Sequence, residues 1–201
     1  SIRIANGTFN IKCTEDGLHS ENSEDSSKGF VYIIGGTLNI SAGDDGIHSG
    51  ASLTVKVGKI NVSESCEGLE GQSINISGGT VSVVSSDDGF NAASSDSSST
   101  LQSNPMAADD SCSINISGGK TTVDADGDGI DSNGSITVSG GEIYVAGPES
   151  GGDGALDYNG TGTVTGGMVI MLGSNKMAQN FGSESTQGVM LVSYSETTGE
   201  T

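Results

Sequence analysis

The amino-acid sequence predicts an all-β chain that folds as one right-handed parallel β-helix, a solenoid of about seven rungs. Two observations lead to this prediction: a short sequence unit recurs along the chain, and apolar residues alternate with polar ones inside each unit. Such alternation is typical of strands with one buried face. No single unit could bury that face alone, so we expect the units to stack around one continuous core. Residues 1–201 are therefore expected to form a single domain.

The first two strands of each unit are expected on either side of a Gly-Gly pair. Residues 74–83, 114–119 and 136–145 are the clearest copies, each with alternating apolar residues beside Gly-Gly. Adjacent glycines weaken a helix and suit a tight corner between strands. Weaker copies begin at Ile2, Val31, Leu53 and Val164.

The third strand of each unit is expected after an acidic residue and a glycine. In this acid-Gly-apolar phrase the glycine shapes a corner and the apolar residue enters the core. Successive acids lie 29, 22, 21, 40 and 25 residues apart, so the basic unit has 21 or 22 residues. Propeller blades of about 40 residues do not fit this spacing, and an antiparallel sandwich does not explain the Gly-Gly register. The acidic positions are Asp16, Asp45, Glu67, Asp88, Asp128 and Asp153.

The longer spacings are expected to hold loops, and the end of the chain a cap. We expect insertions at residues 21–28 and at about 93–111, the second of which is rich in Ser and Asp and contains Pro105. Residues 168–201 contain four of the five methionines. Flexible methionine suits the covering of an open solenoid end. We also expect a final strand at residues 188–194.

The recurring acids predict a metal. In a parallel β-helix equivalent residues lie above one another, and carboxylates about 5 Å apart raise one another's pKa unless a cation neutralises them. Oxygen ligands select hard cations, so we expect Ca²⁺ sites shared by adjacent rungs; the alternative is that the acids merely face solvent. The candidate ligands are Asp16, Asp44, Asp45, Glu67, Asp87, Asp88, Asn91, Asp126, Asp128, Asp131, Asp153 and Asp157. Three residues after the acids come His19, His48, Glu70, Asn91 and Asp131.

Charge and cysteine content exclude several classes of function. The chain has 26 acidic and 7 basic residues and a formal net charge of −19, so we expect neither a nucleic acid nor an anionic membrane as partner. It has no transmembrane run, and we interpret it as a trimmed segment of a secreted or bacterial cell-surface protein. Three cysteines at unrelated repeat positions imply no disulfide framework, and two histidines without paired-cysteine spacing predict no zinc site.

With the Gly-Gly rungs and the acid-Gly-apolar corners in place, the sequence resembles a family of bacterial surface β-helix proteins described as carbohydrate-binding domains. The resemblance spans roughly residues 2–171. It implies calcium on the side of the helix and ligands such as cellulose or polygalacturonate. Asp44-Asp45-x-x-His48 and Asp87-Asp88-x-x-Asn91 are also similar to a calcium cluster of pectate lyases, except at the last position.

These inferences favour a non-catalytic, calcium-dependent carbohydrate-binding module for plant cell-wall or acidic polysaccharide. Calcium would bridge carboxylates of the protein and uronates of the glycan. Two alternatives remain: a calcium-dependent pectate lyase, and a structural stalk or adhesin that calcium stiffens. The lyases that this chain resembles use a Lys or Arg base beside the calcium, and no acid-Gly corner of this chain contains one. We therefore expect no catalytic residues.

Overall fold

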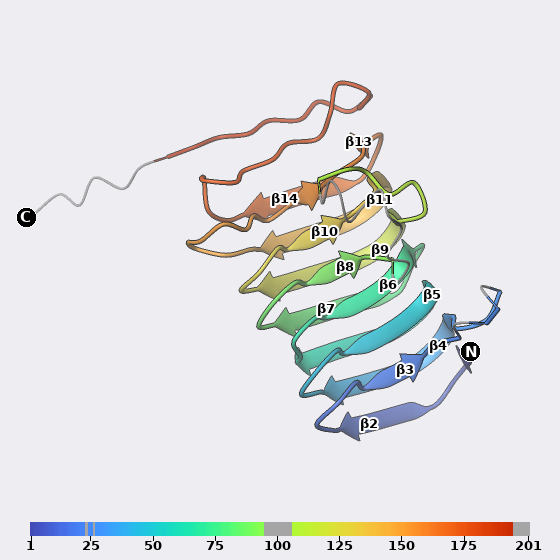
Figure 1. Ribbon diagram of the computed structural model, residues 1–201. Coiled ribbons are helices and arrows are strands. Elements are labelled where there is room, and N and C mark those ends of the chain that lie inside the picture. The colour runs from blue at the N-terminus through green and yellow to red at the C-terminus, as the bar shows by residue number, and fades with distance from the viewer. Residues whose placement is uncertain (23, 26, 95–105, 195–201) are drawn as a thin grey trace, which may run out of the picture.

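The computed structural model describes residues 1–22, 24–25, 27–94 and 106–194 of the chain. Within these ranges the chain forms strands and no helix, so the expected all-β class is confirmed. Figure 1 shows successive turns of the chain lying in layers, in the order of the sequence from blue to red. The same ranges contain no helix long and apolar enough to cross a membrane.

Three faces run along the stack, and each receives one segment from every turn of the chain. All strand pairs in the described ranges are parallel and belong to one sheet. The first face is formed by β1 (Ile2–Ile4), the start of β4 (Val31–Ser41), the middle of β5 (Ile47–Glu64), the end of β6 (Leu69–Ile76), the starts of β9 (Ser113–Ala125) and β11 (Ser135–Ala146), and β13 (Gly162–Val164).

The other two faces follow in the same order within each turn. The second face is formed by β2 (Thr8–Lys12), the later parts of β4, β5, β9 and β11, β7 (Thr80–Ser85) and β14 (Met168–Leu172). The third face is formed by β3 (Leu18–Ser20), the starts of β5 and β6, β8 (Phe90–Ala92), β10 (Ile130–Ser132) and β12 (Asp157–Tyr158).

Inward side chains stack into apolar ladders that form the core. On the first face Ile33 lies opposite Val55, which lies opposite Ile76, and each is at most 1% exposed. Phe90 of the third face is also fully buried. Burial of one such side chain contributes about 1.5–3 kcal/mol. Alternation along the sequence thus places one apolar side chain of every layer on its equivalent in the next.

The Gly-Gly pair turns the chain from the first face to the second. Its second glycine takes a positive φ, as Gly79 does at +83°, a conformation that other residues rarely adopt. Its first glycine lies against the preceding layer: a Cβ on Gly78 would be 2.4 Å from the carbonyl oxygen of Lys56. At this corner both positions therefore require glycine, whereas in two other layers Asn6 and Val57 precede the glycine of positive φ, so only the second position is glycine in those layers.

One predicted corner is displaced by one residue. In the last complete turn the amide of Gly129 donates to the carbonyl of Gly154 (2.9 Å), where earlier turns present the carbonyl of an acid. Gly154 rather than Asp153 therefore occupies the corner position above Asp128. The expected sixth acidic corner at Asp153 is wrong, because Ala146 lies opposite Asp124 and the loop from residue 146 to residue 154, longer than its equivalent from residue 124 to residue 128, brings Gly154 opposite Asp128. The Asp153 side chain is exposed.

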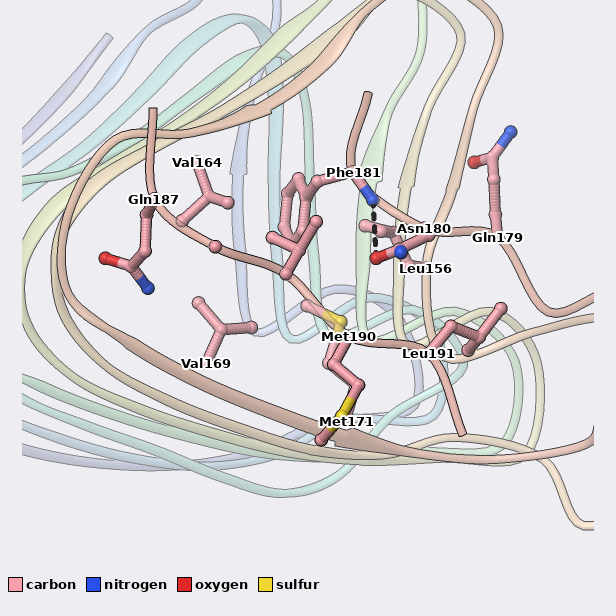
Figure 2. A pocket seen from close by; sticks show the side chains of 12 residues that line it. Leu156, Val164, Val169, Met171, Gln179, Asn180, Phe181, Gln187, Met190 and Leu191 are labelled. Atoms are coloured by element: carbon pink, nitrogen blue, oxygen red, sulfur yellow. Dashed lines mark hydrogen bonds between the residues drawn. The ribbon is translucent and has the colours of Figure 1, made fainter. Parts of the chain in front are cut away.

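The C-terminal cap covers the core mainly through an aromatic ring. Phe181, which is 9% exposed, lies with Leu156, Val164 and the half-buried Met171 around a pocket of about 290 Å³ at the end of the stack (Figure 2). No strand forms at residues 188–194. The expected filling of this end by methionines is wrong for the three exposed ones, Met168, Met177 and Met190.

The first expected insertion is a turn between β3 and β4. Within it the side chain of Asn22 accepts a hydrogen bond from the amide of Asp25 (2.7 Å), and Lys28 pairs with Asp25 (3.1 Å). The second expected insertion includes residues 95–105, which lie outside the described residues, as do residues 195–201 of the expected cap.

A single methyl group at a corner glycine should destabilise the stack. In the Gly89→Ala variant the new Cβ would lie 2.2 Å from Val123 Cγ1 and 2.5 Å from the carbonyl oxygen of Gly129. We expect the free energy of unfolding to fall by about 2 kcal/mol or more, measured by urea unfolding followed by circular dichroism. Gly152→Ala is the matched control, since no atom lies within 4 Å of its Cβ position. Equal stability of the two variants would contradict this account of the corner.

Candidate functional site: the acidic corner

The acidic residue of each unit lies where the chain turns from the second face to the third. There the amide of the next glycine donates to the carbonyl of the acid in the following layer, as Gly68 does to Asp88 (2.9 Å). A Cβ on Gly68 would lie 2.1 Å from Val83 Cγ1, so only glycine lets the backbone turn this close to the core. Five acids are stacked in this way, and we name them the acidic corner: Asp16, Asp45, Glu67, Asp88 and Asp128.

Carboxylates of the acidic corner hold one layer to the next. Oδ1 of Asp16 accepts a hydrogen bond from the amide of Asp45 (3.1 Å). Oδ1 of Asp88 accepts one from the amide of Asp128 (2.7 Å), and Oδ1 of Asp128 one from Gly154 (2.6 Å). Each bond satisfies a backbone donor at the point where the chain changes direction. The alternative that the acids merely face solvent therefore does not hold for these three.

A second row of polar side chains lies on the third face, three residues after the acids. Its members lie opposite one another in register, beside the acidic corner. The imidazole rings of the first two, His19 and His48, are stacked with centroids 4.6 Å apart and planes 10° from parallel. We name this row the polar ladder: His19, His48, Glu70, Asn91, Asp131 and Asp157.

In the first three layers the imidazoles balance the acids. Nδ1 of His48 contacts the carboxylate of Glu70 and lies 3.4 Å from Oδ2 of Asp45. Hydrogen bonds with Asp45 and Glu70 raise the pKa of His48 to about 10. Burial raises the pKa of Asp45, but its hydrogen bonds outweigh burial and the pKa is lowered. Nδ1 of His19 contacts Asp16 in the same manner.

Glu67, in the middle of the acidic corner, forms no ion pair with a cation in the described part of the chain. Burial, together with the negative charges of Glu70 and Asp45, raises the pKa of Glu67 to about 8, although Asn91 Nδ2 donates to its Oε1 (2.9 Å). Among the described residues, Oε2 of Glu67 and Oδ1 of Asn91 are buried without a hydrogen-bond partner. Two buried oxygens thus lack the donor or cation that buried polar atoms normally have.

The last layers gather three carboxylates at one point. Asp128, Asp131 and Asp157 each offer an oxygen, and the three oxygens lie within 4.8 Å of one another. Burial, then the repulsion of neighbouring acids, raises the pKa of Asp131 to about 7, and burial raises those of Asp88 and Asp128 to about 7 and about 6. In the described part of the chain no Lys, Arg or His forms an ion pair with these acids. The arrangement suits a divalent cation.

The structure divides the predicted ligands into two sets. We use the name convergent groups for sets of three His, Asp or Glu residues whose ligand atoms lie within 4.8 Å of one another. Four predicted ligands have exposed side chains and belong to no such group among the described residues: Asp44, Asp87, Asp126 and Asp153. These four predicted ligands therefore do not come together with other ligand atoms in the described part of the chain. The remaining eight lie in the acidic corner or the polar ladder: Asp16, Asp45, Glu67, Asp88, Asn91, Asp128, Asp131 and Asp157.

Four members of the convergent groups were not among the predicted ligands: His19, Glu21, His48 and Glu70. Asp45 comes within ligand distance of His48 and Asp16 on one side, and of Glu67 and Glu70 on the other. The signal was present in the sequence, because His48 and Glu70 share the offset of three residues from their acids. The offset shows that these residues occupy equivalent positions, but only the pairing register of the strands shows that the polar ladder lies beside the acidic corner.

Comparison with known proteins gives one match. A protein-family model described as "Carbohydrate-binding domain-containing protein" matches residues 1–154, which hold the whole acidic corner and most of the polar ladder. Asp157 lies just beyond the matched part. No curated protein and no solved structure gives a significant match to this chain.

Without metal, the raised pKa values should make stability fall as pH rises. Asp131 releases its proton near the ordinary pKa of 3.8 when unfolded, but at about 7 when folded. Between these pH values the folded state binds more protons, so its free energy of unfolding falls with rising pH and the fall ends above about pH 7. We expect Asp131→Asn, measured by thermal unfolding in chelator, to show a shallower fall than the unmodified protein.

The control for this experiment is Asp126→Asn, whose side chain is exposed and outside the convergent groups of the described residues. It should reproduce the pH dependence of the unmodified protein. A steeper fall in Asp131→Asn would contradict the assignment of a protonated carboxyl at this position.

Proposed function

This chain belongs to the carbohydrate-binding domain-containing protein family, and on that premise we propose that it is a non-catalytic module that binds plant cell-wall or acidic polysaccharide with the help of Ca²⁺. We further propose that the layered stack is a right-handed parallel β-helix, because connections between parallel strands of one sheet are right-handed in nearly all proteins. The polysaccharide would be of the polygalacturonate or cellulose class, and the protein secreted or displayed on a bacterial cell surface.

The observation that carries the proposal of calcium is the convergence of Asp128, Asp131 and Asp157. The donor set consists of carboxylate oxygens, which favour a hard cation, and Ca²⁺ accepts such ligands in flexible geometry. The ion would offset the burial and the neighbouring negative charges that raise the pKa of Asp131 to about 7 and that of Asp128 to about 6. Glu67 and Asn91, each with a buried oxygen without a partner in the described residues, support a second position in the middle of the stack.

A bound ion at Asp128, Asp131 and Asp157 would remain open to ligands from solvent. All three residues are only partly buried, so the protein does not enclose the site. A uronate carboxylate of a polysaccharide could then complete the coordination. This bridge explains how a chain with a net charge of −19 could bind an acidic polymer.

A groove on the first face offers a second contact for a sugar chain. The groove, of about 400 Å³, is lined by Tyr32, Lys56, Asn75 and Asn115 among others. The Arg3 guanidinium lies 5.3 Å, and Lys56 Nζ 5.9 Å, from the centre of the Tyr32 ring. Neither cation forms an ion pair with a carboxylate in the described part of the chain. Aromatic stacking and a charge-assisted bond to uronate are thus both available.

The spacing of this groove suits a polymer. Asn115 donates from Nδ2 to Oδ1 of Asn75 (3.2 Å), so two adjacent layers present an amide at the same position, and Thr54 and Thr137 occupy it in the layers on either side. Neighbouring strands lie about 4.8 Å apart, which is close to the advance of a polysaccharide per hexose unit. Successive sugars could therefore meet successive layers, with each amide offering both a donor and an acceptor.

The alternatives have weaker support. A pectate lyase of the expected kind would need a Lys or Arg base at the carboxylates, and no such ion pair occurs with the acidic corner in the described ranges. Release of ultraviolet-absorbing unsaturated products from pectate and Ca²⁺ would nevertheless support a lyase. A stalk would use the acids only to join layers, and it has no need of the groove beside Tyr32.

Removal of calcium should weaken both stability and glycan binding. We expect Ca²⁺ to raise the thermal midpoint, and chelator to weaken binding to polygalacturonate by about tenfold or more, as calorimetry would show. The double variant Asp131→Asn, Asp157→Asn should bind as weakly with Ca²⁺ as the unmodified protein does in chelator, because it lacks two of three convergent carboxylates. Asp126→Asn should bind normally. Binding that is indifferent to both chelator and the double variant would refute the calcium bridge.

A separate prediction concerns the contribution of the groove to glycan binding. Tyr32→Ala should weaken polygalacturonate binding by about five- to tenfold through loss of stacking, in a measurement at saturating Ca²⁺. The matched control is Tyr144→Ala, since Tyr144 carries a similar cation contact from Lys120 (5.3 Å) on the second face. If the two variants bind equally, the groove is not the contact surface for sugar.

A further inference from the structure

The start of the stack contains a group of nitrogen and oxygen ligands that differs from the all-oxygen group at its end. His19, Glu21 and His48 each offer one ligand atom, and these atoms lie within 4.8 Å of one another. His19 Nε2 lies 3.7 Å from Oε2 of Glu21. The two imidazoles come from neighbouring layers, since His19 lies opposite His48 between β3 and β5.

Local packing explains why Glu21 reaches the imidazoles. Glu21 follows directly after β3, and its side chain lies over Gly50 of the next layer. A Cβ on Gly50 would lie 2.9 Å from Glu21 Cγ, so glycine at this position leaves room for the carboxylate. The acid thus lies beside the rings rather than being directed away from the stack.

A carboxylate already contacts Nδ1 of each ring. Nδ1 of His19 contacts Asp16, and Nδ1 of His48 contacts Glu70. A carboxylate at Nδ1 fixes the orientation of an imidazole, keeps the ring proton at Nδ1 in the neutral form, and leaves Nε2 as the ligand atom. This carboxylate–histidine arrangement is the one that typically supports histidines bound to zinc.

We propose that His19, His48 and Glu21 form a binding site for a divalent transition-metal ion of the zinc class. Two imidazoles and one carboxylate are a ligand set that suits Zn²⁺ and leaves a coordination position open. The ion takes the place of any proton on Nε2, which is released to solvent. Asp16 and Glu70 act as positioning residues.

The surroundings of the site are compatible with a bound ion and an additional ligand. A groove of about 340 Å³, lined by His19, Glu21, His48 and neighbouring acids, adjoins the three ligands. The site lies in the first two layers, whereas Asp131 and Asp157 lie in the fifth and sixth. It does not depend on glycan binding, and imidazole nitrogen distinguishes it from the proposed calcium positions.

The proposed site departs from the sequence prediction of no zinc site. That prediction was based on the absence of paired cysteines and the small number of histidines. His19 and His48 are 29 residues apart in the sequence, a spacing that no short metal motif contains. The parallel register brings them into one stacked pair.

The test uses the whole chain with Ca²⁺ in excess, so that the all-oxygen groups are occupied. Zn²⁺ is titrated by calorimetry, and Co²⁺ is used as a spectroscopic substitute whose visible absorption reports nitrogen ligands in a low-coordinate site. We expect one strongly bound Zn²⁺ per chain. His19→Ala, at a ring that is 52% exposed, and Glu21→Gln should weaken binding by at least about tenfold.

Two further variants separate this site from its neighbours. Asp16→Asn keeps an acceptor for the Asp45 amide but loses the charge at His19 Nδ1, and should weaken Zn²⁺ binding about 10- to 100-fold. Asp131→Asn should leave Zn²⁺ affinity and the Co²⁺ spectrum unchanged. The proposal is overturned if no Zn²⁺ binds, if binding survives His19→Ala, or if Asp131→Asn abolishes it. Circular dichroism of each variant verifies that the fold is retained.

Discussion

Parallel, in-register pairing between successive layers is the constraint on which the rest of the structure depends. Because each turn of the chain repeats the path of the one before, the strand residues of one layer lie against their equivalents in the next, apart from local shifts of register. For Ile33, Val55 and Ile76 this produces a dry core without any long-range search for partners. For Asp16, Asp45 and Glu67 the same rule brings like charges together. The geometry that builds the core therefore also creates the electrostatic problem of the acidic corner.

The stack resolves that problem differently along its length. At Asp16, Asp88 and Asp128 a backbone amide of the next layer donates to the carboxylate. Imidazoles supply positive charge in the first layers, where the pKa of His48 rises to about 10. Toward the other end no Lys, Arg or His of the described residues forms an ion pair with the acids, and burial, then the repulsion of neighbouring acids, raises the pKa of Asp131 to about 7. The two ends thus offer different sites, one with nitrogen and oxygen ligands and one with oxygen alone. The proposed zinc-class and calcium positions follow from this difference.

The acidic groups and the basic groove lie on different parts of the surface. The acidic corner lies between the second and third faces, whereas the groove with Tyr32, Arg3 and Lys56 lies on the first face. Two of the chain's 7 basic residues, Arg3 and Lys56, lie beside one aromatic ring of this groove, in a chain with 26 acidic residues. A polysaccharide with carboxylates could therefore be bound directly by cations on one face and through a metal ion at the corner. Membership of a carbohydrate-binding family agrees with a molecule that offers repeated polar contacts along a straight stack.

The sequence by itself determined the all-β class, the repeat and the stacking of five acids, because alternation and glycine positions are local properties that the backbone must obey. It also indicated the row of the polar ladder through the constant offset of His48 and Glu70 from their acids. Only the tertiary structure decided that Gly154, and not Asp153, lies above Asp128 of the acidic corner. This register depends on the length of the preceding loop and not on any sequence motif. The tertiary structure alone placed His48 between two carboxylates and left Phe181 rather than the methionines over the core end. These outcomes depend on side-chain packing between layers, where residues far apart in the sequence become neighbours about 4.8 Å apart.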